Sequence, residues 1–247
     1  MDIQFYQENG YWIEPGVFTP EECDALVRAS LELDNYRNGS CRPAMMPHRV
    51  DEIFLCALRN PRIVSSMNAL VGGTPVGLQT EFFYCKPGTR GFSLHQDNFF
   101  VEAPAGAFAS AWVALTDVTP ENGGLIAYPG THKEGLLPVQ KIQLATDEGQ
   151  DPNANNEECI VPPRYARLDV SVPKGAVFYI HGHLVHGSNP NASDDRWRHV
   201  LLMTYLREGA AFRAGKYAQR TPVRVAGMEE ESHILPVSVQ QMAETAA

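Results

Sequence analysis

The chain has 247 residues, of which 44% are hydrophobic, and it carries a formal net charge of −9. We expect residues 1–247 to form a single domain, because all-β folds of this length commonly do. The basic residues are scattered along the sequence, which argues against nucleic acid and against a polybasic membrane contact. No apolar run approaches the roughly 18 residues that a bilayer span needs. The composition therefore predicts a globular protein with a full-sized core.

The N-terminal residues and the cysteines predict the compartment. Residues 1–5 contain no charged start followed by an apolar run, so no signal peptide is predicted. The five cysteines are odd in number and show no CxxC spacing. We therefore expect free thiols in a reducing environment and a cytoplasmic protein.

Two helices are predicted in the first third of the chain. Thr19 can cap a helix that has Pro20 at its first position, and Glu22 is placed to close a capping box. A second helix begins at Asn60, with an apolar stripe at helical spacing. Residues 36–52 between them are rich in Arg, Pro and Met and predict a loop.

The rest of the chain predicts β-structure. Short strands are expected at Val76–Tyr84, Ala109–Thr116, Leu125–Tyr128, Ala166–Val172, Ala176–Ile180 and Val200–Leu206. Strands without intervening helices indicate an antiparallel jelly roll or barrel. We therefore expect a mainly β protein with flanking α-helices: a helical part at about 1–73 and a double-stranded β-helix (jelly roll, cupin-like) core at about 74–210. The polar stretch 141–164 predicts a lid or mobile excursion, and the tail after 207 has no assignable pattern.

The most informative stretch is Gly91–Phe100, which contains His95 and Asp97 two residues apart. On a β-strand, positions i and i+2 point to the same face, so these side chains would offer one imidazole nitrogen and one carboxylate oxygen to a common point. One further histidine would complete a 2-His-1-carboxylate facial triad. That triad is the metal site of non-heme Fe(II) oxygenases.

Histidines and an arginine suited to this chemistry follow the strand Ala176–Ile180. His181, His183 and His186 lie within six positions, and Arg198 comes twelve residues after the last of them. An arginine on an inward strand face pairs bidentately with a carboxylate. A ligand that chelates a metal at one end and meets this arginine at the other would be a short dicarboxylate such as 2-oxoglutarate.

With these residues in place, the chain resembles the phytanoyl-CoA dioxygenase family of Fe(II)/2-oxoglutarate oxygenases. The resemblance runs over most of the sequence as an ordered set of motifs. They are Gly10-Tyr11 with Pro15-Gly16-Val17-Phe18, Lys86-Pro87-Gly88, His95-Gln96-Asp97, the stretch Trp112–Leu125, Pro129-Gly130-Thr131-His132, and His186-Gly187-Ser188 with Asn191.

The resemblance implies a cofactor set and roles for particular residues. Fe(II), the cosubstrate 2-oxoglutarate and O2 would take part in the reaction. His95, Asp97 and His186 would be the iron ligands, and Arg198 would hold the distal carboxylate of 2-oxoglutarate. Four further residues are expected to contact the cosubstrate or face the site: Trp112, Ser188, Gln79 and Tyr84.

The position of the arginine departs from the family pattern. The family places it eleven residues after the second histidine, where this chain has Trp197. The surrounding sequence favours Arg198 over Arg196, with one residue inserted in the loop. Both arginines are expected on the same strand face.

The resemblance implies hydroxylation of an unactivated C–H bond in a small-molecule metabolite, with release of succinate and CO2. The short chain and the small residues Ala107, Ala109 and Ala111 indicate a biosynthetic enzyme of bacterial secondary metabolism. Halogenating relatives have a small residue at the position of Asp97, so its carboxylate favours oxygenation. The same site could also desaturate, epoxidise, cyclise or epimerise. A non-catalytic cupin-like ligand-binding protein and a cupin-type zinc hydrolase are further alternatives, and the hydrolase leaves Arg198 unexplained. The primary substrate and the oligomeric state stay open.

Overall fold

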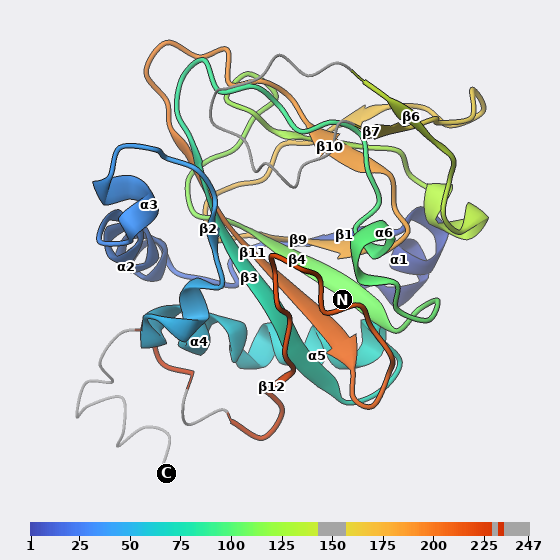
Figure 1. The fold of residues 1–247 in the computed structure, drawn as a ribbon, viewed down its shortest axis with the longest axis horizontal. Coiled ribbons are helices and arrows are strands. Elements are labelled where there is room, and N and C mark those ends of the chain that lie inside the picture. Colours follow the sequence, from blue (N-terminus) through green and yellow to red (C-terminus); the bar gives the residue numbers. More distant parts are fainter. Residues whose placement is uncertain (143–156, 229–231, 235–247) are drawn as a thin grey trace.

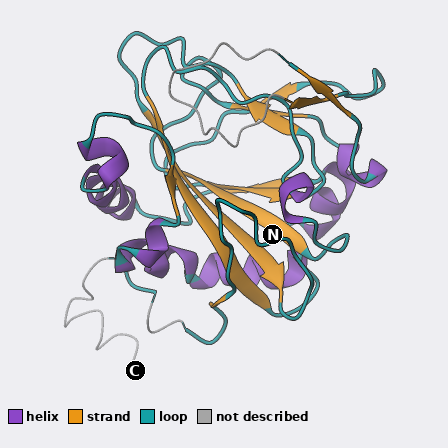
Figure 2. Ribbon diagram, viewed as in Figure 1, coloured by secondary structure: helices purple, strands orange, loops and turns teal. Residues whose placement is uncertain are grey.

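The structure is a computed structural model that describes residues 1–142, 157–228 and 232–234. It is mainly β, with two antiparallel sheets facing each other and helices packed on the outer side of the larger sheet (Figure 1, Figure 2). The predicted jelly-roll class is confirmed. Residues 143–156 of the predicted lid lie outside the described residues. Within the described ranges, no helix has the length and apolar character that crossing a bilayer requires.

The helices lie mostly in the first third of the chain. They are α1 (Ile3–Asn9), α2 (Pro20–Leu31), α3 (Asp34–Arg37), the 3-10 helix η1 (Pro47–Arg49), α4 (Glu52–Leu58), α5 (Pro61–Leu70), α6 (Asn98–Val101) and the 3-10 helix η2 (Thr131–Glu134). The strands are β1 (Tyr11–Glu14), β2 (Ala44–Met45), β3 (Pro75–Cys85), β4 (Phe108–Ala114), β5 (Leu125–Ala127), β6 (Val139–Lys141), β7 (Glu157–Cys159), β8 (Leu168–Asp169), β9 (Val177–His181), β10 (His186–Ser188), β11 (Arg198–Arg207) and β12 (Val223–Arg224).

The larger sheet has the strand order β1-β9-β4-β11-β3-β12, with β2 also paired to β3. The smaller sheet has the order β10-β5-β8, and β6 pairs with β7. Strand β11 is central, because it pairs along nearly its whole length with β3 on one side and β4 on the other. Side chains that alternate along these three strands therefore point in turn toward the helices and toward the smaller sheet.

The main hydrophobic core fills the space between the larger sheet and the helices. From α5, Ile63 and Met67 are fully buried against it, and from β3, Phe82 is fully buried on the same face. Burying each such side chain contributes about 1.5–3 kcal/mol. This core fixes the larger sheet as a rigid support for the side chains on its other face.

The helix that follows Thr19 forms as predicted. The Thr19 hydroxyl accepts a hydrogen bond from the backbone N–H of Glu22, and the Glu22 carboxylate accepts one from the N–H of Thr19. The helix at Asn60 is also present, and the Asn60 side chain caps it. Helix α4 was not predicted, although Asp51 caps it, because seven residues are too few to show a helical period clearly.

The His95 stretch differs from the predicted strand. His95 makes only an isolated antiparallel bridge to His186, after which the chain turns and Asp97 immediately precedes α6. Asp97 has a helical backbone conformation, with φ −56° and ψ −36°. The two side chains therefore converge through a turn and not through strand alternation.

The chain after β11 returns across the open side of the larger sheet. Strand β12 pairs with the outer part of β3, with Val223 opposite Gly77, and Val225 is buried nearby. The sequence did not predict this return, since residues 208–228 contain one strand of only two residues. It brings a C-terminal segment next to residues that are more than a hundred positions earlier in the chain.

Candidate active site

Three side chains converge between the two sheets. Nε2 of His95 and Nε2 of His186 each lie 3.5 Å from Oδ1 of Asp97. One ligand atom from each residue lies within 4.8 Å of the others, a spacing that fits a single metal ion. Two backbone hydrogen bonds of 2.8 and 3.0 Å between His95 and His186 bring α6 and β10 together.

Hydrogen bonds orient all three side chains. Nδ1 of His95 lies 2.7 Å from the carbonyl of Ser93, and Nδ1 of His186 lies 3.1 Å from the carbonyl of Leu184. A carbonyl can only accept, so each Nδ1 carries the proton and each Nε2 presents its lone pair. Oδ2 of Asp97 accepts a hydrogen bond of 2.6 Å from Ser110, which leaves Oδ1 for a metal. Such supporting contacts typically fix ligand orientation in metal sites.

The charge states also suit a metal. Burial lowers the pKa of His186 to about 4, so its imidazole is neutral. Burial alone would raise the pKa of Asp97, but His186, His95 and Ser110 together hold it well below its usual range. Burial also disfavours the charged form of His95, yet its interaction with the Asp97 carboxylate, which accepts a hydrogen bond from the charged imidazole, raises its pKa overall. A proton and a metal ion would therefore compete for His95.

Two glycines permit the close approach of the His95 segment to β10. A Cβ atom built on Gly91 would lie 1.9 Å from the carbonyl oxygen of Ser188, and one built on Gly187 would lie 2.7 Å from that of Phe92. Any larger residue would push the two backbones apart. Gly91 and Gly187 therefore allow the two backbones that carry His95 and His186 to lie side by side.

Arg198 lies at the start of β11 and is only 4% exposed. Its Nη1 donates to the carbonyl of Gly123 at 2.5 Å, whereas its Nε has no hydrogen-bond partner. Within the described ranges, no carboxylate lies within ion-pair distance of this guanidinium, and burial lowers its pKa. A buried cation without a counter-ion is costly, so the site favours an anionic ligand.

The structure separates the two candidate arginines. Arg196 lies before β11, is exposed, and forms an ion pair with Glu121 at the surface. It does not share a strand face with Arg198, contrary to the expectation, because the strand starts only at residue 198. Only Arg198 points into the interior.

A cavity of about 610 Å³ connects the triad with Arg198. Trp112 and Ser188, both expected near the cosubstrate, line it. The Trp112 ring centre lies 5.9 Å from the guanidinium carbon of Arg198, and the Ser188 hydroxyl accepts a hydrogen bond of 2.9 Å from the N–H of Phe92. Gln79 also lines the cavity, between Glu81 and Arg220.

The expectation for Tyr84 is corrected by the structure. Tyr84 faces the helices and packs in the main core, and its hydroxyl donates a hydrogen bond of 2.6 Å to the carbonyl of Ser30. Gln79, Glu81 and Phe83 occupy the alternate positions of β3 and line the cavity. Tyr84 alternates with these residues along β3, so its side chain points to the opposite face of the strand, away from the cavity.

Several residues of the site were not predicted. Ser110 lies two positions before Trp112 on β4, and this alternation was the available signal for its inward direction. A further group of cavity-lining residues comes from the C-terminal segment: Arg213, Gly215, Lys216, Tyr217, Ala218 and Arg220. Nothing in the sequence pattern placed that segment beside the triad.

The remaining histidines of the dense cluster have structural contacts. Nε2 of His183 lies 2.8 Å from the side-chain amide of Asn98, and Nδ1 of His181 accepts from the N–H of His183 at 3.0 Å. Burial lowers the pKa of His181 to about 3, so it is a neutral core side chain. His186 is thus the member of the cluster that meets His95 and Asp97.

The sequence of the chain matches a known protein family over most of its length. The sequence model of the family described as Phytanoyl-CoA dioxygenase (PhyH) matches residues 6–200. The chain belongs to the phytanoyl-CoA dioxygenase family. It is a 2-oxoglutarate-dependent dioxygenase with Fe(II) and 2-oxoglutarate as cofactors.

Individual proteins show the similarity, one in sequence and two in fold. Phytanoyl-CoA dioxygenase domain-containing protein 1 of Mus musculus is 28% identical over 226 residues, which cover 89% of this chain and 71% of the relative. The epimerase SnoN, solved with Fe3+, α-ketoglutarate and nogalamycin RO, has a TM-score of 0.67 at 23% identity, covering 85% of this chain and 84% of SnoN. The carbocyclase SnoK has a TM-score of 0.68 at 22% identity, covering 87% and 86%.

Proposed function

We propose that the enzyme hydroxylates an unactivated C–H bond of a small-molecule metabolite, with His95, Asp97 and His186 as the iron ligands. The convergence of their three ligand atoms within 4.8 Å carries this proposal. It is supported by Nδ1 hydrogen bonds that turn both imidazole Nε2 atoms inward. Iron held by these three residues, together with 2-oxoglutarate and O2, would supply the oxidising power for C–H cleavage, with succinate and CO2 as co-products.

We assign Arg198 to the distal carboxylate of 2-oxoglutarate. Its unpartnered Nε and its deep burial make it the charge in this cavity that most needs an anion. Trp112 and Ser188 would flank the cosubstrate between Arg198 and the triad. Gln79 would line the metal end of the cavity, held there by Arg220.

The protein's own contribution is orientation and exclusion of water. Ser110 holds Asp97 so that one carboxylate oxygen faces the ligand position. Apolar side chains, including Phe92, Phe100 and Leu202, form much of the cavity wall and shield the reacting bond from solvent. Cytoplasmic location and action on a secondary metabolite remain predictions. The second is supported by the fold's likeness to SnoN and SnoK of nogalamycin biosynthesis.

Succinate formation tests this function. Purified protein with Fe(II), 2-oxoglutarate and O2 should release succinate, and a panel of metabolites should include compounds that stimulate the release and gain one oxygen atom by mass spectrometry. His186→Ala should abolish the release, whereas His183→Ala should retain it. Equal succinate formation by wild type and His186→Ala would refute the assignment. A desaturated, cyclised or epimerised product would replace hydroxylation by another outcome of the same cofactor chemistry.

A further inference from the structure

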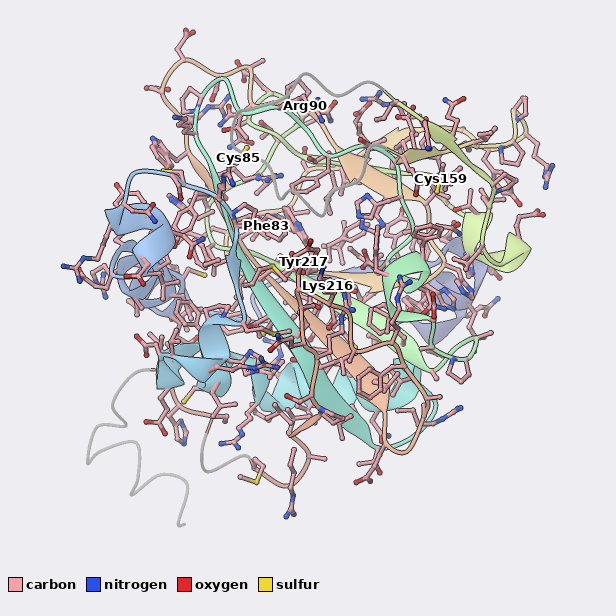
Figure 3. The ribbon with its side chains drawn as sticks, viewed as in Figure 1. Phe83, Cys85, Arg90, Cys159, Lys216 and Tyr217 are labelled. Carbon is pink, nitrogen blue, oxygen red and sulfur yellow. The ribbon has the colours of Figure 1, made fainter. Side chains whose placement is uncertain are left out.

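Residues 213–220 supply six of the residues that line the cavity and lie beyond the family match at 6–200. Lys216 and Tyr217 are exposed, so this segment lies at the mouth of the cavity, where it opens to solvent. Figure 3 shows Lys216 and Tyr217 of this segment near the centre of the view, close to Phe83 of β3. Both side chains line the cavity that contains the triad. The part of the cavity that an incoming substrate meets first therefore belongs to this chain's own C-terminal return.

The segment is fastened at both ends. The N–H of Arg213 donates to the carbonyl of Val101 at 2.6 Å, and its Nη2 donates to that of Phe99 at 2.9 Å. Its Nη1 also forms an ion pair of 2.8 Å with Glu102. Downstream, β12 joins the segment to β3. The contacts of Arg213 tie the segment to α6, the helix that directly follows Asp97, and β12 ties it to the larger sheet.

Arg220 connects the segment to the inner face of β3. Its Nε donates to Oε1 of Gln79 at 2.6 Å, and its Nη1 donates to the carbonyls of Phe100 and Arg213, each at 3.2 Å. Gln79 in turn donates to the carboxylate of Glu81. The charges of Arg220 and Arg213 are thus used within the protein and hold the segment in place.

Lys216 is different. It is one of the three basic residues in 213–220, it is exposed, and its charge is not one of those that hold the segment in place. Among the described residues no carboxylate forms an ion pair with the Lys216 ammonium, which lies 5.5 Å from the ring centre of Tyr217. An exposed ammonium without a carboxylate partner at the edge of a cavity attracts anions.

The other charged groups of the cavity have assigned contacts, apart from one. Asp97 and Arg198 belong to the proposed cofactor site, and Glu81, Arg213 and Arg220 contact protein groups. Glu157 on β7 also lines the cavity, and it would favour a cation instead. The unpaired ammonium of Lys216, carried on a segment that hydrogen bonds hold in place, favours the anion.

We propose that residues 213–220 form the substrate-selecting wall and that Lys216 binds an anionic group of the primary substrate. Tyr217 and Phe100 would pack against the apolar or aromatic body of that substrate. Such a substrate would be a small organic acid whose body reaches the triad. This inference rests on the proposed function, because it takes the same cavity to be the reaction chamber.

Ligand-observed fluorine NMR tests it without turnover. The probes are 4-fluorophenylacetate, its neutral amide, and the cationic 4-fluorophenethylamine, added to enzyme loaded with Zn²⁺ in place of iron and saturated with 2-oxoglutarate. The wild type should bind the carboxylate most tightly. Lys216→Ala should weaken that binding about fivefold, Lys216→Arg should restore it, and binding of the amide should not change.

The control is Lys133→Ala, which removes an exposed lysine of η2 outside the cavity lining and should have no effect. The inference would be overturned if the wild type did not bind the carboxylate, or if it bound the amine more tightly or all three probes equally. Unchanged carboxylate affinity in Lys216→Ala would overturn it as well. Saturation with 2-oxoglutarate and metal content are measured first on the same samples. A protein that fails those two measurements contradicts the proposed function, whereas one that passes them and shows no charge preference contradicts only the role of Lys216.

Discussion

The metal triad and the 213–220 wall bound the same cavity, but they are held by different means. The triad is fixed from within the fold, by backbone carbonyls behind each histidine and by Ser110 behind Asp97. The wall is fixed from outside, by arginine side chains that bond to carbonyls near α6. This difference separates the chemistry, which depends on the β-core, from selectivity, which can change with one surface segment.

The largest effect in this comparison, apart from loss of a metal ligand, is expected for Arg198→Leu. Truncating one partner of a buried charge pair typically costs about 2–5 kcal/mol, so 2-oxoglutarate affinity should fall by about a hundredfold. Isothermal titration of the metal-loaded protein with 2-oxoglutarate measures this. Arg196→Leu is the matched control, because it removes a surface partner of Glu121 and should leave the affinity unchanged. If Arg196→Leu lowered the affinity and Arg198→Leu did not, Arg196 would be the residue that binds the distal carboxylate.

Ser110→Ala should weaken metal binding about tenfold, the lower end of what the loss of a hydrogen bond to a metal ligand costs. The hydroxyl fixes Oδ2 of Asp97 at 2.6 Å, and without it the carboxylate can rotate. Competition with a chelator under anaerobic conditions measures the Fe(II) affinity. Unchanged affinity would show that the fold holds Asp97 without Ser110.

Arg220→Leu should loosen the wall and leave the triad intact. The variant loses the hydrogen bonds to Gln79, Phe100 and Arg213, so trypsin should cleave the chain near Lys216 several times faster than in the wild type. Fe(II) affinity should stay the same. If Fe(II) affinity falls and trypsin cleavage does not accelerate, the metal triad and the 213–220 wall are not held independently of each other.

The smallest effect is expected for Tyr84→Phe. The change removes one buried hydrogen bond to the carbonyl of Ser30 and should lower the free energy of unfolding by about 1 kcal/mol. Urea denaturation measures the loss. Because Tyr84 faces the helices, 2-oxoglutarate affinity should not change. A reduced affinity would show that Tyr84 contributes to the cosubstrate site after all.

The sequence predicted what local patterns encode. The capping box at Thr19 depends on residues three positions apart, and the spacing of His95 and Asp97 and the position of His186 are family motifs. Alternation also predicted inward faces, but it was applied to Tyr84 without fixing the phase of β3. The ladder from β3 to β11 sets that phase, and long-range pairing is not visible in the sequence of one strand.

Two features required the folded chain. The convergence of His95 and Asp97 occurs at a turn into α6, where strand alternation does not apply. The placement of Lys216 and Tyr217 at the cavity mouth results from pairing between β12 and β3, two segments separated by more than a hundred residues. Neither the composition nor the periodicity of residues 208–228 carries a signal for that contact.

The most direct test of the iron site is an anaerobic titration of the protein with Fe(II) and 2-oxoglutarate, followed by visible absorption. The wild type should develop the charge-transfer band of a chelated keto acid, with a stoichiometry of about one iron per chain. Asp97→Ala should not develop the band at the same iron concentration, and neither should His186→Ala. A full-strength band in either variant, or none in the wild type, would contradict the assignment of these three residues as the iron ligands.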